Sequence, residues 1–354
     1  MEPAAQVVIG VDAHKRTHTL VAADELGREL ASKTFAATAD GHLAAIAWAG
    51  RWPSRRWALE DCRHLTRTLE ADLLRAGEQV VRVPTQMMAG VRRSARQRGK
   101  SDAIDALAVA RAAWREPDLP VARLDGPSRQ VRLLVDHRDD LVAERTRLQS
   151  RIRWHLHEIA PELEIPARGL KLQHVVERVA DRLADPDGLI ASICREQLDR
   201  VRELNHRINE LEREITPLIR ALAPALLSIP GCGALTAAKL VGETAGAQRF
   251  RSKSAYARWN RTAPQPASSG NTTRFRLNRG GNRQVNAALH RIALTQARAC
   301  PPGRDYNTKR LRQGNTKTEA LRLLRRQLSD VVYRTLLIDE LAAQPDLDVH
   351  THNT

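Results

Sequence analysis

The sequence predicts a mixed α/β domain at the N-terminus, a helical middle region and a basic, mainly helical C-terminal region. Three observations support this: short apolar runs suited to buried strands before residue 84, apolar residues at helical spacing through the middle, and positive charge concentrated near the C-terminus. A length of 354 residues allows two or three domains. We expect boundaries that give regions 1–118, 119–226 and 227–342 and a disordered tail over 343–354.

The N-terminal region contains strand-like and helix-like segments in a definite order. The apolar run at 7–12 suits a buried strand, and the turn-like residues 24–27 separate two further strand-like segments. We therefore expect three antiparallel strands, a helix, a strand, a helix and a last strand, at 7–12, 18–22, 29–35, 39–50, 56–60, 64–76 and 79–83. This is the order of a ribonuclease-H-like fold, although other mixed sheets share parts of it.

The middle region contains apolar residues at heptad spacing, with Val201, Ile208, Ile215 and Leu222 at one position and leucines at the other (204, 211 and 218). β-branched residues at the first position and leucine at the second favour a two-stranded parallel coiled coil, and so a dimerisation region. An intramolecular hairpin with the helix at 134–159 is an equally good interpretation. Pro217 predicts a kink in the last heptad.

Charge is distributed unevenly along the chain. There are 57 basic and 41 acidic residues, a formal net charge of +16, and residues 227–330 hold 20 basic but only 4 acidic side chains. Such localisation indicates a surface for a polyanion. No apolar run approaches the length that spans a bilayer, and residues 1–11 do not resemble a signal peptide. The four cysteines are widely spaced, which argues against a zinc ribbon or disulfide framework. We expect a cytoplasmic protein that binds nucleic acid and not membrane.

Four carboxylates are candidates for a metal site. Asp12 and Glu60 end the first and fourth predicted strands, which lie side by side in a ribonuclease-H-like sheet, and Asp102 and Asp105 lie on one face at the start of a helix. Converging carboxylates repel one another unless cations neutralise them, and oxygen ligands suit Mg²⁺ or Mn²⁺. Each acid alone has an ordinary structural interpretation, but the set predicts a metal centre. His14 and His18 follow closely and could assist at this site, but a polar loop position is the better interpretation.

Two glycine-containing segments in the basic region are further candidates. Gly231 and Gly233 precede a predicted helix, where free backbone N–H groups can bind phosphate. Ser269 lies in a Ser/Gly loop and could attack phosphorus if activated; from spacing alone, an ordinary loop in a basic groove is the better interpretation. Four arginines follow and are expected to hold backbone phosphates: Arg274, Arg276, Arg279 and Arg283.

Five motifs, taken in their order along the chain, resemble the DEDD transposases of the insertion-sequence-110 family, relatives of the Piv DNA invertases. They are GVDAHK, WALE, KSDAIDA, IPGCG and PQPASSG, at residues 10–15, 57–60, 100–106, 229–233 and 264–270, and the last is followed by the helix start GNR at 281–283. The resemblance spans most of the chain. Each motif by itself is modest, but their order is specific.

The resemblance implies a RuvC-like N-terminal domain whose metal ligands are Asp12, Glu60, Asp102 and Asp105. It implies that Ser269 is a nucleophile that forms a phosphoserine link to DNA, although the adjacent Ser268 is an alternative. It further implies DNA and a structured guide RNA, the bridge RNA, as partners, in a bacterial cell near the nucleoid. Protomers of the family assemble as dimers or tetramers so that the acidic domain of one completes a site with the serine domain of another.

The sequence therefore predicts a transposase that excises and inserts its own element by DNA strand cleavage and transfer. Two other functions stay open. A nuclease of the Holliday-junction-resolvase type would use water and need no serine. A catalytically inactive relative would bind nucleic acid without cutting it.

Overall fold

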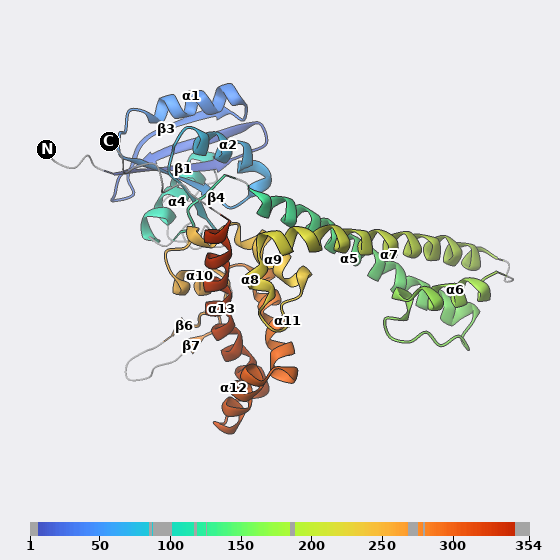
Figure 1. Cartoon of the computed structure of the whole chain (residues 1–354). Coiled ribbons are helices and arrows are strands. Elements are labelled where there is room, and N and C mark those ends of the chain that lie inside the picture. The colour runs from blue at the N-terminus through green and yellow to red at the C-terminus, as the bar shows by residue number, and fades with distance from the viewer. Residues whose placement is uncertain are drawn as a thin grey trace, which may run out of the picture. The chain divides into compact units, whose positions relative to one another are not determined.

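The structure is a computed structural model that describes residues 6–84, 87, 101–116, 119–124, 126–184, 188–267, 275–278 and 280–343. The chain divides into two compact units (Figure 1). One is Pro127–Glu243, and the other contains the described residues before and after it. The division into regions 1–118, 119–226 and 227–342 stays a prediction, and the expected disordered tail lies outside the described residues beyond position 343.

The N-terminal part contains a five-stranded mixed sheet. Its strands are β1 (Val7–Ala13), β2 (Thr17–Ala23), β3 (Glu29–Ala36), β4 (Arg55–Glu60) and β5 (Val80–Val83). They lie in the order β3-β2-β1-β4-β5. The first three are antiparallel neighbours, and β4 and β5 continue the sheet in parallel with β1. The expected strand order of a ribonuclease-H-like domain is confirmed.

Helices cover both faces of this sheet. Side chains of β1 alternate between the faces, as strand geometry requires. Ile9 and Val11 pack in one cluster with Trp48 of α1 (Ala39–Ala49) and Leu69 of α2 (Arg63–Arg75), whereas Val8 packs in a second cluster with residues of α4 (Asp102–Arg115). Because β1 is buried on both faces, its sequence is apolar until Asp12. In β4, which begins with two arginines, only the three residues before Glu60 are apolar and buried.

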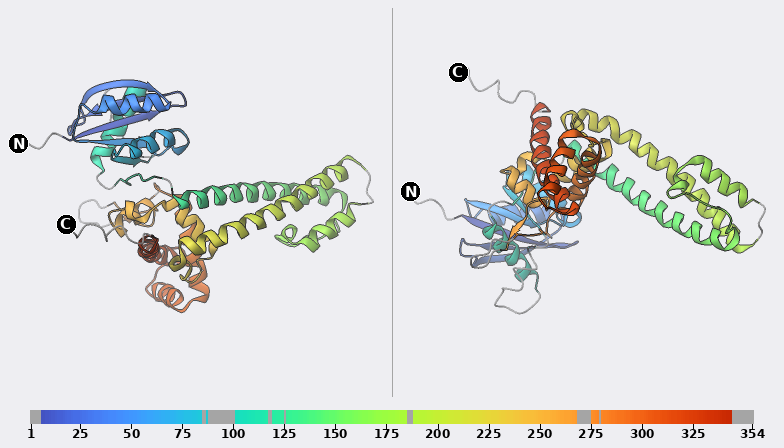
Figure 2. Two further views of the ribbon diagram at one scale, coloured as in Figure 1. Left: turned by 45° about the horizontal axis from the view of Figure 1, so that its top comes forward. Right: turned by 90° about the horizontal axis from the view of Figure 1, so that it is seen from below.

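The unit Pro127–Glu243 is built on a helical hairpin. The long helices α5 (Pro127–Ile159) and α7 (Leu189–Leu222) lie side by side in every view (Figure 2). The short helices η1 (Gly169–Lys171) and α6 (Gln173–Arg182) lie in the connection between them. Helix α7 continues through Pro217.

The heptad residues of α7 are used within one chain. Val201, Leu204, Ile208, Leu211 and Ile215 are all buried, and α7 packs along α5. A parallel coiled coil with a second copy would need the same apolar side chains. The structure therefore favours the intramolecular hairpin.

Two short helices complete this unit, α8 (Pro224–Leu227) and α9 (Ala234–Thr244). The buried Lys239 of α9 reaches two carboxylates of α5, Asp136 at 2.9 Å and Asp139 at 2.8 Å. A Cβ atom at Gly242 would lie 2.9 Å from the Cα of Arg132, so α9 approaches α5 too closely for a larger residue. These contacts fix α9 on the hairpin.

The C-terminal part is mainly helical. Its elements are η2 (Ala247–Arg249), α10 (Lys253–Trp259), β6 (Gln265–Pro266), β7 (Phe275–Arg276), α11 (Arg283–Ala299), α12 (Pro301–Arg312) and α13 (Lys317–Ala342). The helices expected near 282–299 and 317–342 are confirmed, and the predicted face of α11 is buried. The sequence did not predict α12, which is too polar to show an apolar stripe and buries only Gly303.

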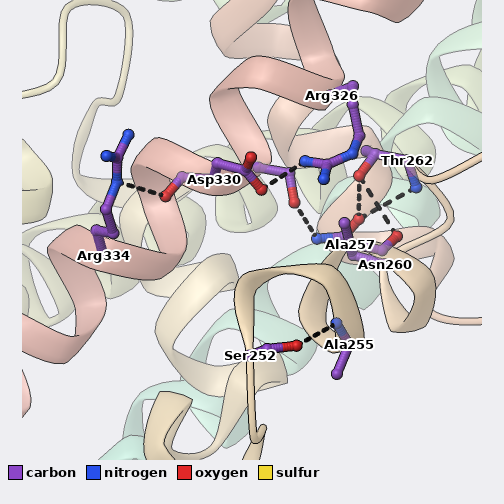
Figure 3. A network of polar contacts seen from close by, with 9 residues as sticks. Ser252, Ala255, Ala257, Asn260, Thr262, Arg326, Asp330 and Arg334 are labelled. Carbon is purple, nitrogen blue, oxygen red and sulfur yellow. Dashed lines mark hydrogen bonds and ion pairs between the residues drawn. The ribbon is translucent and has the colours of Figure 1, made fainter.

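A polar network joins the end of α10 to α13 (Figure 3). The buried Asn260 donates from Nδ2 to Ser329 Oγ at 2.8 Å, and its Oδ1 accepts from the Thr262 hydroxyl at 2.6 Å. Ser252 caps the first turn of α10 by accepting from the backbone N–H of Ala255. The segment that leads into the β6–β7 hairpin therefore starts from a fixed base.

None of the described helices combines the length and apolarity that crossing a bilayer requires.

Candidate active site

The sheet brings Asp12 and Glu60 together. Val11 of β1 is directly paired with Leu59 of β4 in parallel register. The next residue on each strand is a carboxylate, so Asp12 and Glu60 lie next to each other at the carboxyl ends of neighbouring parallel strands. In open sheets this edge is where ligands bind.

Helix α4 brings two more carboxylates to this edge. Its N-cap is Ser101, whose Oγ accepts from the backbone N–H of Ile104, and Asp102 and Asp105 are both in its first turn. The helix approaches β1 very closely at Gly10, where a Cβ atom would lie 2.1 Å from the carbonyl oxygen of Ala106. Glycine at this position allows the first turn of α4 to lie beside the end of β1.

The electrostatics of Asp12 show that the four carboxylates interact. The pKa of Asp12 is raised from 3.8 to about 6: burial is the largest cause, His14 opposes the rise, and the negative charges of Asp105, Asp102 and Glu60 add to it. The other three predicted carboxylates are therefore all within electrostatic range of Asp12. Their roles as ligands or catalysts stay predictions.

His14 belongs to the same cluster. Its Nδ1 lies 3.7 Å from Asp12 Oδ2 and 3.9 Å from Asp102 Oδ2. Among the described residues, Asp12, His14 and Asp102 each offer a ligand atom within 4.8 Å of the others. His14 is an exposed loop residue, as predicted, and it reaches the cluster through the tight turn after β1, where the His14 N–H donates to the Thr17 carbonyl.

This donor set fits a divalent cation. The carboxylates are hard oxygen ligands, and burial first and the neighbouring negative charges second raise the pKa of Asp12, an effect that a bound cation would offset. Asp12 is mostly buried, with 13% of its side chain exposed, while Asp102 is open to solvent at 59%. The cluster is therefore accessible to solvent at Asp102.

Two short paired strands, β6 and β7, flank the predicted serine in the sequence, and we call this strand pair the serine hairpin. Ser268, Ser269, Arg274 and Arg279 fall outside the described residues. On either side of the predicted serine, β6 and β7 pair in antiparallel fashion, with Gln265 opposite Arg276.

The base of this hairpin is fixed at Asn278 and Gly281. Asn278 donates from Nδ2 to the Arg258 carbonyl at 2.9 Å. Gly281 has φ +86°, and a Cβ atom there would lie 2.2 Å from the Trp259 carbonyl oxygen, so only glycine fits. The next residue, Asn282, caps α11 by accepting from the N–H of Val285.

Two of the four predicted phosphate-binding arginines are described, and both are exposed. Arg276 is on β7, and Arg283 is the first residue of α11. Burial first and the charge of Arg283 second lower the pKa of Arg261, so two guanidinium groups lie close together there. Such a pair favours an anion, but phosphate binding at these arginines stays a prediction.

The glycine segment before α9 forms a tight turn. The N–H of Cys232 donates to the Ile229 carbonyl at 2.9 Å, and Gly231 has φ +83° at the third position, as a type II turn requires. The carbonyl of Gly233 accepts from Thr236 and Ala237, and the space around its α-carbon is open. The geometry leaves room for a ligand beside Gly233.

Two family models match this chain. One, for the DEDD type of IS110 protein and described as transposase, covers residues 9–161, which include all four carboxylates. The other, described as transposase of the IS116/IS110/IS902 family, covers residues 223–308, which include the glycine turn and the serine hairpin. The chain belongs to the IS110 family of transposases.

Relatives of this IS110-family protein come from other insertion elements. The IS116 protein of Streptomyces clavuligerus is 35% identical over 162 residues, which are 45% of this chain and 40% of that protein. The IS900 protein of Mycobacterium paratuberculosis is 24% identical over 383 residues, 94% of this chain and 96% of its own length. The IS110 protein of Streptomyces coelicolor is 34% identical over 112 residues, or 31% of this chain and 28% of the relative.

The solved structure of T. thermophilus RuvC in complex with Holliday junction substrate is similar to part of this IS110-family protein. It is 15% identical and covers 31% of this chain and 93% of its own, with a TM-score of 0.25. At this TM-score the similarity is too weak to support a conclusion about the fold. The ribonuclease-H-like topology rests on the strand order and register of the sheet.

Proposed function

We propose that this IS110-family protein is a DNA recombinase that excises and inserts its own insertion sequence by strand cleavage and transfer. The observation that carries the proposal is the gathering of Asp12, Glu60, Asp102 and Asp105 at one edge of a ribonuclease-H-like sheet. Carboxylates that gather and repel one another at the edge of a sheet suit phosphoryl-transfer chemistry with a cation.

In this proposal Ser269 is the nucleophile. Its Oγ forms a bond to a DNA phosphorus, and the bond between that phosphorus and the leaving deoxyribose oxygen breaks. A carboxylate of the acidic cluster accepts the serine proton, and water protonates the leaving oxygen. In the transfer step, the hydroxyl of a second strand attacks the phosphoserine and restores the free serine.

The acidic residues would hold Mg²⁺, or Mn²⁺ in its place, with His14 beside them. When bound, the cation supplies positive charge at the reacting phosphate. Asp12 fixes one side of the site from the rigid end of β1, and α4 supplies the more exposed Asp102. Arg274, Arg276, Arg279 and Arg283 position the DNA phosphates near the serine.

We further propose two kinds of partner for the IS110-family protein. A structured guide RNA selects the donor and target DNA. A second copy, in a dimer or tetramer, provides the acidic cluster that completes the site with the serine hairpin. The strongly basic stretch 227–330 supports a nucleic-acid partner.

An excision assay on the native element tests the serine mechanism. Ser269→Ala and Asp102→Ala should each abolish excision while leaving the melting temperature and RNA binding unchanged. Wild type should form a protein–DNA adduct that survives denaturation, and Ser269→Ala should not. If Ser268→Ala is inactive and Ser269→Ala is active, the nucleophile is the neighbouring serine.

Two other outcomes would replace the proposal. Metal-dependent cleavage of four-way junctions by both serine variants, without an adduct, would identify a resolvase-type nuclease that uses water. Strong, salt-sensitive binding without cleavage by the wild type would identify a binding protein.

A further inference from the structure

The face of α5 that packs on α7 changes from apolar to polar in its middle. Val135 and Ile152 are buried on either side of this stretch, and Arg145 and Gln149 are buried within it. Only 6% of Arg145 and 9% of Gln149 is exposed. A buried guanidinium is costly unless hydrogen bonds and an opposite charge compensate it.

The described residues do not compensate the charge of Arg145. Its Nη1 donates to Asn205 Oδ1 at 2.8 Å, and Asn205 in turn donates to the Leu170 carbonyl at 3.1 Å. Both partners are neutral. Within the described parts of the chain, Arg145 Nε and Gln149 Nε2 are buried without any hydrogen-bond partner. Two donors, one of them on a buried cation, are therefore left unused.

The charges that shift the pKa values of Arg145 and Lys171 are all positive, although one of the cations, Arg138, is itself paired with Glu212. Burial first, and then the positive charge of Arg138, lowers the pKa of Arg145. Burial and then the charges of Arg145, Arg168 and Arg138 lower the pKa of Lys171. Arg168 and Lys171 are exposed and flank the segment before α6. Cations on α5 and at η1 thus converge on one place.

We propose that Arg145, Gln149 and Lys171 form an anion site that binds a backbone phosphate of a nucleic acid. A phosphodiester beside the exposed Lys171 and Arg168 supplies the negative charge that Arg145 lacks, and its oxygens accept from the buried donors of Arg145 and Gln149 once neighbouring side chains shift. The site belongs to the unit Pro127–Glu243 and is separate from the carboxylate cluster and the serine hairpin. The inference rests on the proposed function in one respect, that the protein binds nucleic acid.

A phosphate fits better than a carboxylate from a second copy of the chain. Five acidic side chains along α7 are already used by arginines of the same unit. Arg200 pairs with Glu203, Arg202 with Asp199, Arg207 with Glu210 and Glu214, and Arg138 with Glu212. A second hairpin would therefore present few free carboxylates from this helix.

Binding assays with a matched control test the site. The probes are a random-sequence DNA duplex and a random-sequence RNA hairpin, each titrated over a range of KCl concentrations. Arg145→Gln should weaken binding of at least one probe about tenfold and reduce the slope of log affinity against log salt by about one. Arg207→Gln removes the same charge from an exposed, ion-paired position and should change neither.

The probe that responds identifies the source of the phosphate, RNA or DNA. Equal behaviour of Arg145→Gln and Arg207→Gln with both probes would overturn the proposal. So would a change of oligomeric state by Arg145→Gln, in sedimentation, with unchanged binding, because it would assign the site to a second copy.

A thermal assay separates this inference from the proposed function. Arg145→Met removes an uncompensated buried charge and should keep or raise the melting temperature. Inorganic phosphate, compared with chloride at equal ionic strength, should raise the melting temperature of wild type more than that of Arg145→Met. If the wild type bound neither probe, the proposed function would fail, but the comparison of phosphate with chloride would still test the anion site. Equal phosphate responses of wild type and Arg145→Met would overturn the anion site.

Discussion

At the candidate active site, both burial and the charges of neighbouring side chains act on Asp12. It ends a strand that is buried on both faces, and three other carboxylates act on it. In the absence of a cation this arrangement disfavours the ionised form. The protein therefore maintains a group whose environment suits a bound cation better than it suits the free carboxylate.

The raised pKa of Asp12 predicts a pH-dependent effect of Asp12→Asn. Because the folded-state pKa is about 6 and the ordinary value is 3.8, the folded state binds this proton more tightly. In metal-free protein the resulting stabilisation is complete below about pH 4 and is lost as the pH rises through about 6. One pKa unit is worth about 1.36 kcal/mol, so near pH 8 Asp12→Asn should be more stable than wild type by up to about 3 kcal/mol.

Thermal melts in EDTA across this pH range measure the difference. The two proteins should converge at low pH, where Asp12 is protonated in both folded and unfolded states. A constant difference at all pH values would show that the ionisation of Asp12 does not control the stability.

At the scale of elements, the contact between β1 and α4 assembles the site. The two elements are far apart in sequence, and they meet where Gly10 leaves no side chain between them. The N-cap at Ser101 then sets where the first turn of α4 begins, and this turn carries Asp102 and Asp105. The positions of these carboxylates therefore depend on a glycine that has no chemical role.

Gly10→Ala should separate α4 from β1. The new methyl group would meet backbone atoms of Ala106 and Ala110, which cannot move without moving the helix. We expect a loss of about 3 kcal/mol in the free energy of unfolding, at the upper end of overpacking effects, and weaker Mn²⁺ binding by calorimetry. Gly126→Ala is the matched control, since nothing lies within 4 Å of its added methyl group. Unchanged Mn²⁺ affinity in Gly10→Ala would refute this role.

In the molecule as a whole, the excess positive charge and the carboxylates of the candidate active site lie in different parts of the sequence. The excess of basic residues lies in 227–330, whereas the carboxylate cluster lies in the N-terminal sheet domain. Binding and cleavage should therefore respond to different conditions.

EDTA should abolish DNA cleavage but leave DNA binding intact, because binding relies on lysines and arginines. Raising the salt concentration should weaken binding steeply, with a linear fall of log affinity against log salt. Electrophoretic binding assays and cleavage assays on the same samples measure both effects. Loss of binding in EDTA, with the fold preserved by circular dichroism, would mean that the cation itself bridges protein and DNA.

The sequence by itself determined the order of elements, the acidic residues at strand ends and the location of positive charge. These depend on local periodicity and composition, which the chain carries without any partner. The five strands and the helices at 39–49, 63–75, 283–299 and 317–342 were predictable for that reason.

Only the tertiary structure decided which surfaces meet. The heptad spacing on α7 fits packing against a second chain or against α5 equally well. The structure decides for α5, because the heptad residues of α7 are buried where it packs along that helix. The inclusion of His14 in the acidic cluster depends on a turn that brings its ring back toward α4. The burial of Arg145 among other cations depends on three segments meeting around it. Long-range contacts of this kind are set by the packing of whole elements, and no local pattern encodes them.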